Sequence, residues 1–159
     1  MKKNLKYFII SLISVIITAF LGSIFTSRNI PFWYKTINLP SLVPPNFVFP
    51  IVWNILFILM IISFYLILIN KSKKNTDFRK IAIWLFSIQL IFNILWSLLF
   101  FELNLLLLVC IEIIILEILI LFSIIYFYKI NKLAAYLLIP YFLWVLFATF
   151  LTISVFILN

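Results

Sequence analysis

Residues 105–128 read LLLLVCIEIIILEILILFSIIYFY, an apolar run in which Glu112 and Glu117 are the only charged residues. An α-helix rises about 1.5 Å per residue, so about 20 apolar residues cross the roughly 30 Å hydrocarbon core of a bilayer. The apolar positions follow one another without the alternation that is typical of a membrane β-strand. The stretch therefore predicts a transmembrane helix.

Four further segments share this length and character. In the whole chain of 159 residues, 67% are hydrophobic and 10% are charged, whereas soluble domains average about 45–50% and about 25%. We therefore expect an all-α integral membrane protein whose residues 1–159 form one bundle of five transmembrane helices. The expected spans are residues 7–27, 47–70, 81–101, 105–128 and 133–158.

Residue counts exclude several kinds of site. The chain has no histidine, which excludes histidine-dependent triads and histidine-ligated zinc or haem. Cys110 is the only cysteine, so neither an internal disulfide nor a cysteine-bound metal cluster is expected. The net charge is +8, but the basic residues lie between apolar segments, so we expect a lipid bilayer and no nucleic acid as partner.

The distribution of Lys and Arg predicts the orientation in the membrane. Ten of the 12 lie at the end of the bundle that holds the N-terminus, and such residues favour the cytoplasmic side. We expect a multi-pass protein of a bacterial cell membrane, with its N-terminus cytoplasmic and its C-terminus outside. The apolar run of the first span exceeds the ~7–15 residues of a signal peptide, so we expect a retained helix. The ten are Lys2, Lys3, Lys6, Lys71, Lys73, Lys74, Arg79, Lys80, Lys129 and Lys132; the other two are Arg28 and Lys35.

The first outer loop, residues 28–46, is the longest connection. It holds four of the six prolines and the pair Trp33 and Tyr34. Proline restricts a loop to turns and extended chain, and a long loop in a compact protein is often functional. We expect a long, proline-rich outer loop that contributes to a site.

The five tryptophans allow two interpretations. Aromatic belts form at membrane interfaces, and this explanation fits Trp84 at the inner end of the third span. Trp144 lies too deep in the fifth span for a belt, while Trp53 and Trp96 fit either interpretation. The second interpretation places Trp33, Trp53, Trp96 and Trp144 around one cavity that opens outward, where they would suit a large flat ligand.

Polar residues inside the spans are the other candidates. Gln89, Asn93 and Ser97 share one face of the third span; contact between helices is favoured for Gln89, and ligand contact is equally open for Asn93. Glu112 and Glu117 are costly inside a bilayer, and no span holds a Lys or Arg to pair with them. Counting from the turn between these helices places Glu112 at the depth of Asn93. We expect at least Glu112 to hydrogen-bond a polar group of the third span; a proton relay through both glutamates is the alternative.

Two features concern helix shape. Thr18 and Gly22, with Ala19 and Ser23 beside them, form a face of small residues that indicates close helix packing. Pro140 lies inside the fifth span and is expected to kink it or to free a carbonyl group.

In their order along the five spans, these motifs resemble the TspO/MBR family, the tryptophan-rich sensory proteins called translocator protein in animals. The resemblance covers nearly the whole chain. The residues that carry it are Trp33, Tyr34, Pro40, Pro44, Pro45, Val52, Trp53, Met60, Trp84, Gln89, Asn93, Trp96, Ser97, Phe100, Phe101, Glu112, Ala135, Leu138, Pro140, Tyr141, Trp144, Phe147, Ala148 and Asn159.

The resemblance implies a five-helix bundle, often a homodimer, with a cavity under the first loop. It implies a receptor that binds porphyrins and similar flat hydrophobic molecules in their sensing, transport or turnover. Protoporphyrin IX or haem is the expected ligand, and no cofactor is required. Some members degrade porphyrin in light, so an enzymatic activity stays open, without assigned catalytic residues. The expected ligand-binding residues are Trp33, Tyr34, Pro44, Trp53, Asn93, Trp144 and Ala148, and the pocket interpretation adds Trp96.

The chain departs from the family pattern at several positions. Phe47 replaces a tryptophan before the second span, Phe57 replaces a tyrosine, Thr152 replaces an asparagine, and Glu117 stands where a tryptophan is common. Two other functions therefore remain as alternatives. One is a proton-coupled carrier of small molecules that uses Glu112 and Glu117, and the other is a membrane scaffold without a ligand.

Overall fold

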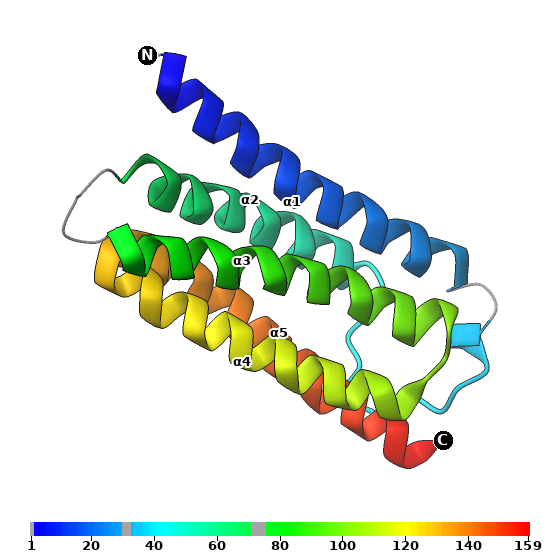
Figure 1. Ribbon diagram of the computed structural model, residues 1–159. Coiled ribbons are helices and arrows are strands. Elements are labelled where there is room, and N and C mark those ends of the chain that lie inside the picture. The colour runs from blue at the N-terminus through cyan, green and yellow to red at the C-terminus, as the bar shows by residue number, and fades with distance from the viewer. Residues whose placement is uncertain (1, 30–32, 71–75) are drawn as a thin grey trace.

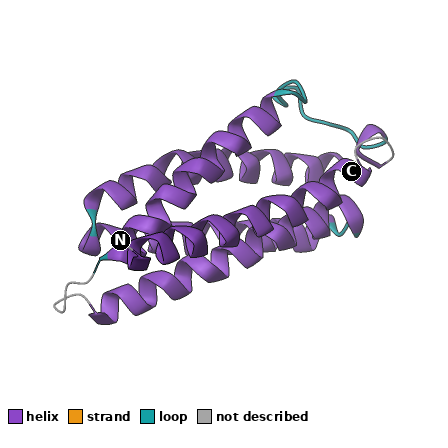
Figure 2. Cartoon of the chain, turned by 90° about the horizontal axis from the view of Figure 1, so that it is seen from above, coloured by secondary structure: helices purple, strands orange, loops and turns teal. Residues whose placement is uncertain are grey.

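A computed structural model describes residues 2–29, 33–70 and 76–159, and these form five long helices (Figure 1). The described residues include no strand (Figure 2), so the prediction of an all-α bundle of five helices is confirmed. The long helices are α1 (Lys2–Asn29), α2 (Val48–Ile69), α3 (Thr76–Ser97), α4 (Leu106–Ile130) and α5 (Lys132–Leu158), with a short 3-10 helix η1 (Trp33–Lys35) and a π-helix η3 (Leu98–Glu102).

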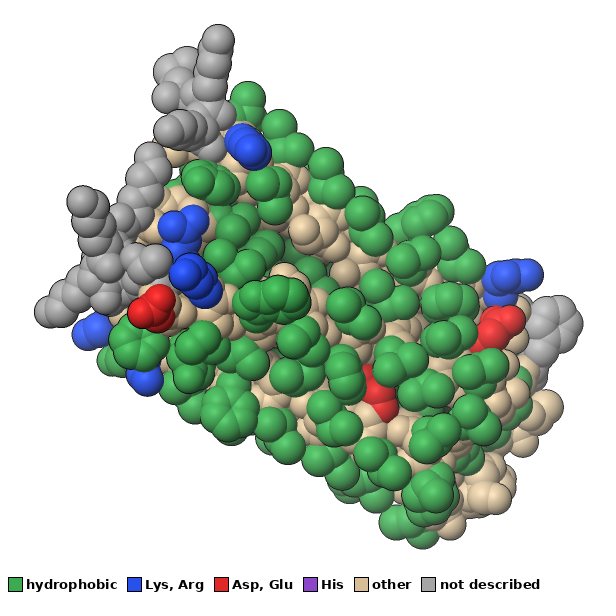
Figure 3. All heavy atoms as spheres, viewed as in Figure 1, with side chains coloured by type: hydrophobic (Ala, Val, Ile, Leu, Met, Phe, Trp, Pro, Cys, Tyr) green, Lys and Arg blue, Asp and Glu red, His purple; other side chains and the backbone are tan. Residues whose placement is uncertain are grey.

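All five long helices have the length and hydropathy needed to cross a membrane. Hydrophobic side chains cover most of the middle of the molecule, and Lys and Arg gather towards its ends (Figure 3). Such a surface is favourable in contact with lipid, whereas exposing so much apolar area to water would be unfavourable. The chain is a multi-pass membrane protein that contacts the lipid bilayer.

The five helices place the two termini at opposite ends of the bundle (Figure 1). We call the end that holds residues 33–47 and Asn159 the loop end. α1 packs on α2 and α3 along one side of the bundle, and near its N-terminus the Phe8 ring lies edge-on to Tyr65 of α2 at 5.8 Å. Asn131 separates α4 from α5 and caps α5 by accepting a hydrogen bond from the Ala134 backbone N–H at 3.2 Å.

The half of the bundle away from the loop end has a closely packed core. The rings of Phe64 and Phe127 lie on the Phe86 ring, with centroid distances of 4.3 and 5.7 Å. The Ser63 hydroxyl donates a 2.7 Å hydrogen bond to the Ala134 carbonyl oxygen and ties α2 to α5. Packing and hydrogen bonds of this kind hold helices together in lipid. Because this half is filled, the main cavity lies towards the loop end.

α3 ends in the π-helix, a wider turn than the α-helix. The Leu103 backbone N–H donates to the Leu98 carbonyl oxygen at 3.0 Å, five residues back. Asn104 then adopts a positive φ of 55°, a conformation that asparagine tolerates better than most residues. The predicted tight connection between the third and fourth spans is present. Its wide turn buries Phe100 and Phe101 inside the bundle.

Two helices begin earlier than the sequence predicts. α1 begins at Lys2 instead of residue 7, and α3 begins at Thr76 instead of residue 81. Bilayer thickness limits the apolar stretch but does not stop a helix from continuing into the polar region. Asp77 also lies in the first turn of α3, where a negative charge is favoured by the helix dipole. Residues 71–75 of the predicted basic loop lie outside the described part of the chain.

Candidate functional site

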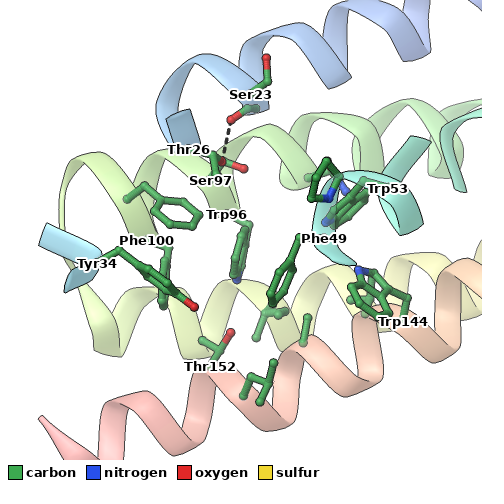
Figure 4. Close-up of a pocket in the computed structure, with 18 of the residues that line it drawn as sticks. Ser23, Thr26, Tyr34, Phe49, Trp53, Trp96, Ser97, Phe100, Trp144 and Thr152 are labelled. Carbon is green, nitrogen blue, oxygen red and sulfur yellow. Dashed lines mark hydrogen bonds between the residues drawn. The ribbon is translucent and has the colours of Figure 1, made fainter. Parts of the chain in front are cut away.

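A cavity of about 390 Å³ lies between the helices at the loop end (Figure 4). Its volume falls within the roughly 300–1,000 Å³ of small-molecule sites. Every long helix contributes to its wall, and Leu39 and Val43 of the first loop close it at the loop end. None of the described residues that line it is charged. The space therefore suits a largely apolar molecule.

The structure places most, but not all, of the predicted binding residues on this cavity. Trp33 and Pro44 do not line it. The edge of the Trp33 ring lies against Phe100 at a centroid distance of 5.1 Å, and Phe100 lines the cavity, so Phe100 separates Trp33 from the open space. Trp84 also lies outside the cavity and is 69% exposed. The predicted residues that line the cavity are Tyr34, Trp53, Asn93, Trp96, Trp144 and Ala148.

Three tryptophans from three helices form the aromatic wall (Figure 4). Trp53 of α2 stacks on Phe57 at 5.2 Å with 30° between the ring planes. Trp144 of α5 meets Phe49 edge-on at 5.9 Å. These rings restrain one another and present broad apolar surfaces to the cavity. An aromatic ligand could stack on such surfaces and gain from both area burial and ring contact.

Trp96 and Tyr34 complete the wall near the loop end. The Trp96 ring lies parallel to Phe100, at 5.1 Å and 10°, and edge-on to Phe101. The Trp96 indole N–H is buried and has no hydrogen-bond partner among the described residues. Tyr34 lies against Phe101 at 5.9 Å. Burial raises the pKa of the Tyr34 hydroxyl, so this group stays neutral at physiological pH.

Hydrogen bonds hold the first loop over the cavity. The Asn38 backbone N–H donates to Asn159 Oδ1 at 2.8 Å, and Asn159 Nδ2 donates to the Asn38 carbonyl oxygen at 3.1 Å. On the other side of the loop, Asn29 Nδ2 donates to Glu102 Oε2 at 2.6 Å. Asn159 belongs to the motif set, and its structural role is to anchor this loop.

A buried polar cluster lies beside the cavity. The Tyr141 hydroxyl donates to Gln89 Oε1 at 2.8 Å and accepts from Asn93 Nδ2 at 3.1 Å. Glu112 is only 4% exposed, so it faces protein, yet neither of its carboxyl oxygens has a hydrogen-bond partner among the described residues. The prediction that Glu112 hydrogen-bonds a polar group of the third span is wrong: Asn93 Nδ2 donates to the Tyr141 hydroxyl instead, and Gln89 Nε2 has no partner among the described residues.

Comparison with known proteins identifies the chain. Residues 10–158 match the TspO/MBR family. The chain belongs to this family.

Named relatives of this TspO/MBR protein come from several microorganisms. It is 34% identical over 156 residues to the tryptophan-rich protein TspO of Archaeoglobus fulgidus, covering 98% of this chain and 99% of the relative. It is 38% identical over 140 residues to that of Chlorobaculum tepidum, covering 88% and 87%. It is 32% identical over 127 residues to protein CrtK of Rhodobacter capsulatus, covering 80% and 78%. Membership fits a membrane binding role related to tetrapyrroles.

The cavity of this TspO/MBR protein has a hydroxyl-bearing wall that the binding-site prediction missed. Thr18, Ser23 and Thr26 of α1 line it, and each hydroxyl donates to a carbonyl oxygen of its own helix. Their oxygen lone pairs remain available to a ligand. Gly22 lies between them, and a Cβ there would lie 3.4 Å from Ser97 Oγ. The spacing of small residues along α1 pointed to this wall, but on sequence grounds it indicates only a face for helix packing.

The departures from the TspO/MBR pattern fall at different places. Phe57 and Thr152 line the cavity, so these two replacements alter the surface that a ligand meets. Phe47 is 66% exposed, and neither Phe47 nor Glu117 lines the cavity. The polar groups offered to a ligand therefore differ from the family pattern at Phe57 and Thr152.

Proposed function

We propose that this protein is a membrane receptor for porphyrins and similar flat hydrophobic molecules, acting in their sensing, transport or turnover. The observation that carries the proposal is the uncharged cavity walled by Trp53, Trp96 and Trp144 from three helices. Stacking on these rings would bind the face of a macrocycle. Arg28 and Lys35, both exposed near the loop end, are available to meet ligand carboxylates at the surface.

The lining supports a metal-free porphyrin over haem. The described cavity wall includes neither cysteine nor methionine, and the chain has no histidine. Of the usual axial ligands of haem iron, the described cavity wall offers only the Tyr34 phenol, which burial keeps neutral. Protoporphyrin IX needs no axial ligand, so it is the first ligand to test.

The proposal also covers the orientation of the protein in the membrane and its oligomeric state. The Lys and Arg distribution supports a cytoplasmic N-terminus in a bacterial cell membrane, which would place the loop end outside. The family resemblance supports a homodimer. Glycosylation-independent topology reporters, such as cysteine labelling at exposed Lys35→Cys from outside intact cells, would test the orientation.

A fluorescence titration tests ligand binding directly. Purified protein in detergent is titrated with protoporphyrin IX while tryptophan emission is recorded. We expect saturable quenching at micromolar ligand. The variants Trp53→Phe and Trp144→Phe are expected to weaken binding by about two- to tenfold, since a stacked aromatic is worth about 0.5–1.5 kcal/mol beyond its buried area.

The matched control is Trp84→Phe. Trp84 is exposed and lies outside the cavity, so its replacement should leave the dissociation constant unchanged. Quenching that does not saturate, or equal weakening in all three variants, would contradict the proposed binding site.

A second candidate is a proton-coupled carrier. It is favoured by Glu112 and Glu117, two carboxyl groups inside the membrane-spanning helix α4; the Glu112 oxygens are buried without a hydrogen-bond partner among the described residues. Buried membrane carboxyls of this kind often belong to proton pathways. This function requires pH-dependent flux of ligand across proteoliposomes and its loss in Glu112→Gln or Glu117→Gln.

A further inference from the structure

A second hollow lies between α1 and α2 on the side of the bundle. Its volume is about 250 Å³. Ile16 of α1 and Ile58 of α2 line it, and these side chains are 52% and 57% exposed. Both residues lie in the middle of membrane-spanning helices. The mouth of this hollow therefore opens towards the lipid.

The hollow adjoins the main cavity. Ala19 and Phe57 line both spaces. On the α1 side the partition is thus a single methyl group, and on the α2 side it is a ring that can change rotamer. Exposed side chains change rotamer on the picosecond to nanosecond timescale; Phe57 is half-buried and stacked on Trp53, so its rotamer changes are slower than this. A small shift at Ala19 and Phe57 would join the two spaces.

Few polar contacts close the seam between α1 and α2. Among the described residues, one side-chain hydrogen bond joins these helices, from the Ser11 hydroxyl to the Ile61 carbonyl oxygen at 2.7 Å. It lies on the side of the hollow away from the loop end. Asn54, beside the hollow, donates to Pro50 in its own helix. α1 is also the least buried of the five spans, since only 17% of the residues in its most apolar stretch are buried. Opening the seam would exchange apolar side-chain contacts for lipid contacts, at little cost.

The route through the loop end is closed more firmly. A ligand entering there must separate the Asn38 and Asn159 hydrogen bonds or the 2.6 Å bond between Asn29 and Glu102. It must also displace loop residues that pack on Phe100 and Phe101. Each lost hydrogen bond costs about 0.5–1.5 kcal/mol, and more where a charged partner is involved.

We propose that ligands enter and leave the cavity sideways from the bilayer, through the hollow between α1 and α2, with Ala19 and Phe57 at the neck. This inference rests on the proposed function, because it needs a ligand in the main cavity. The class of ligand it admits is a molecule that dissolves in the hydrocarbon region of the membrane. A small water-soluble molecule without a large apolar body would be excluded.

Two reversible cross-links test the route. In a Cys110→Ser background, one pair, Ile16→Cys with Ile58→Cys, bridges the mouth of the hollow. The matched pair, Asn38→Cys with Asn159→Cys, bridges the loop to α5. Neither pair lines the main cavity. Both are joined by a bis-methanethiosulfonate linker and released by dithiothreitol. Stopped-flow quenching by protoporphyrin IX in phosphatidylcholine nanodiscs gives the rates, and long incubation gives the dissociation constant.

We expect the cross-link at the hollow to slow association and dissociation at least about tenfold, with the dissociation constant changed by less than about twofold, because a blocked route alters both rates alike. Dithiothreitol should restore both rates. The cross-link at the loop should change them less than about twofold. A second variant without a cross-link, Ile58→Phe, should slow both rates by narrowing the mouth.

The contrast between the two cross-links decides the outcome. Equal slowing by both, greater slowing by the cross-link at the loop, or no slowing by either would overturn the lateral route while leaving binding intact. Absence of saturable quenching in the protein without cross-links would instead overturn the proposed function, and the lateral route with it.

Discussion

The Tyr141 hydroxyl of α5 donates a 2.8 Å hydrogen bond to Gln89 Oε1 of α3, across 52 residues of sequence. Both side chains are almost completely buried. Asn93, which donates to the same hydroxyl, also lines the cavity. One hydroxyl thus connects two membrane helices and fixes a polar group at the cavity wall.

Replacing Tyr141 by phenylalanine keeps the ring and removes the hydroxyl. Gln89 Oε1 and Asn93 Nδ2 would then be buried without this partner, which costs about 1–3 kcal/mol for an unsatisfied group. We expect the free energy of unfolding to fall by that amount in detergent. Tyr136→Phe is the control, because Tyr136 is 54% exposed. Equal stability of the two variants would show that the Tyr141 bonds contribute nothing.

Glu112→Gln should not destabilise the protein. The carboxyl oxygens of Glu112 have no hydrogen-bond partner among the described residues, and a neutral amide of similar volume removes a charge that is costly in the membrane. We expect the midpoint of thermal unfolding to stay the same or rise. A loss of more than about 1 kcal/mol would mean that the carboxyl group has a stabilising partner.

Two substitutions at Gly22 distinguish an effect on helix stability from an effect on cavity volume. Gly22→Ala would place a methyl group 3.4 Å from Ser97 Oγ, an ordinary contact, and alanine favours a helix by about 0.8–1.0 kcal/mol over glycine. We expect a more stable protein with ligand affinity largely kept. Gly22→Leu would fill part of the cavity and should weaken porphyrin binding more than it changes stability. Unfolding and quenching titrations of the two variants, made in parallel, check this.

Asn38→Ala should loosen the first loop. It removes the Asn38 side-chain bond to the Leu158 carbonyl oxygen at 3.3 Å. Without that bond, the Asn38 backbone is held less firmly where it forms its two hydrogen bonds with Asn159. We expect faster backbone hydrogen exchange in residues 33–47, measured by mass spectrometry, with the helices unaffected. Asn54→Ala is the matched control, since Asn54 bonds only within α2. Unchanged exchange in the loop would show that other contacts hold it.

Much of the fold can be predicted from the sequence because the lipid environment imposes one simple requirement on every span. Each span must be long, apolar and internally hydrogen-bonded, and this property is visible in a run such as residues 105–128. Trp144 could also be assigned to a cavity, since a large amphipathic ring at mid-membrane has no place in an interfacial belt.

The details of the site were harder to predict because they depend on how the helices are rotated about their axes. Depth along a hairpin pairs Glu112 with Asn93, but depth alone says nothing of α5, which brings Tyr141 to the same amides. The position of Trp33 depends on a loop contact with Phe100, which no helical periodicity describes.

The π-helix at the end of α3 has a consequence for how chain length can vary in this region. A π turn holds one residue more than the α turn it replaces, and here it follows directly on the parallel contact between Trp96 and Phe100. Deletion of Leu99 would remove this extra residue and restore regular α-helical winding while the later side chains keep their directions, whereas a deletion in the regular part of α3 would rotate every later side chain by about 100°. Natural variants that lose a single residue should therefore be found more often between Ser97 and Glu102 than in the regular part of α3.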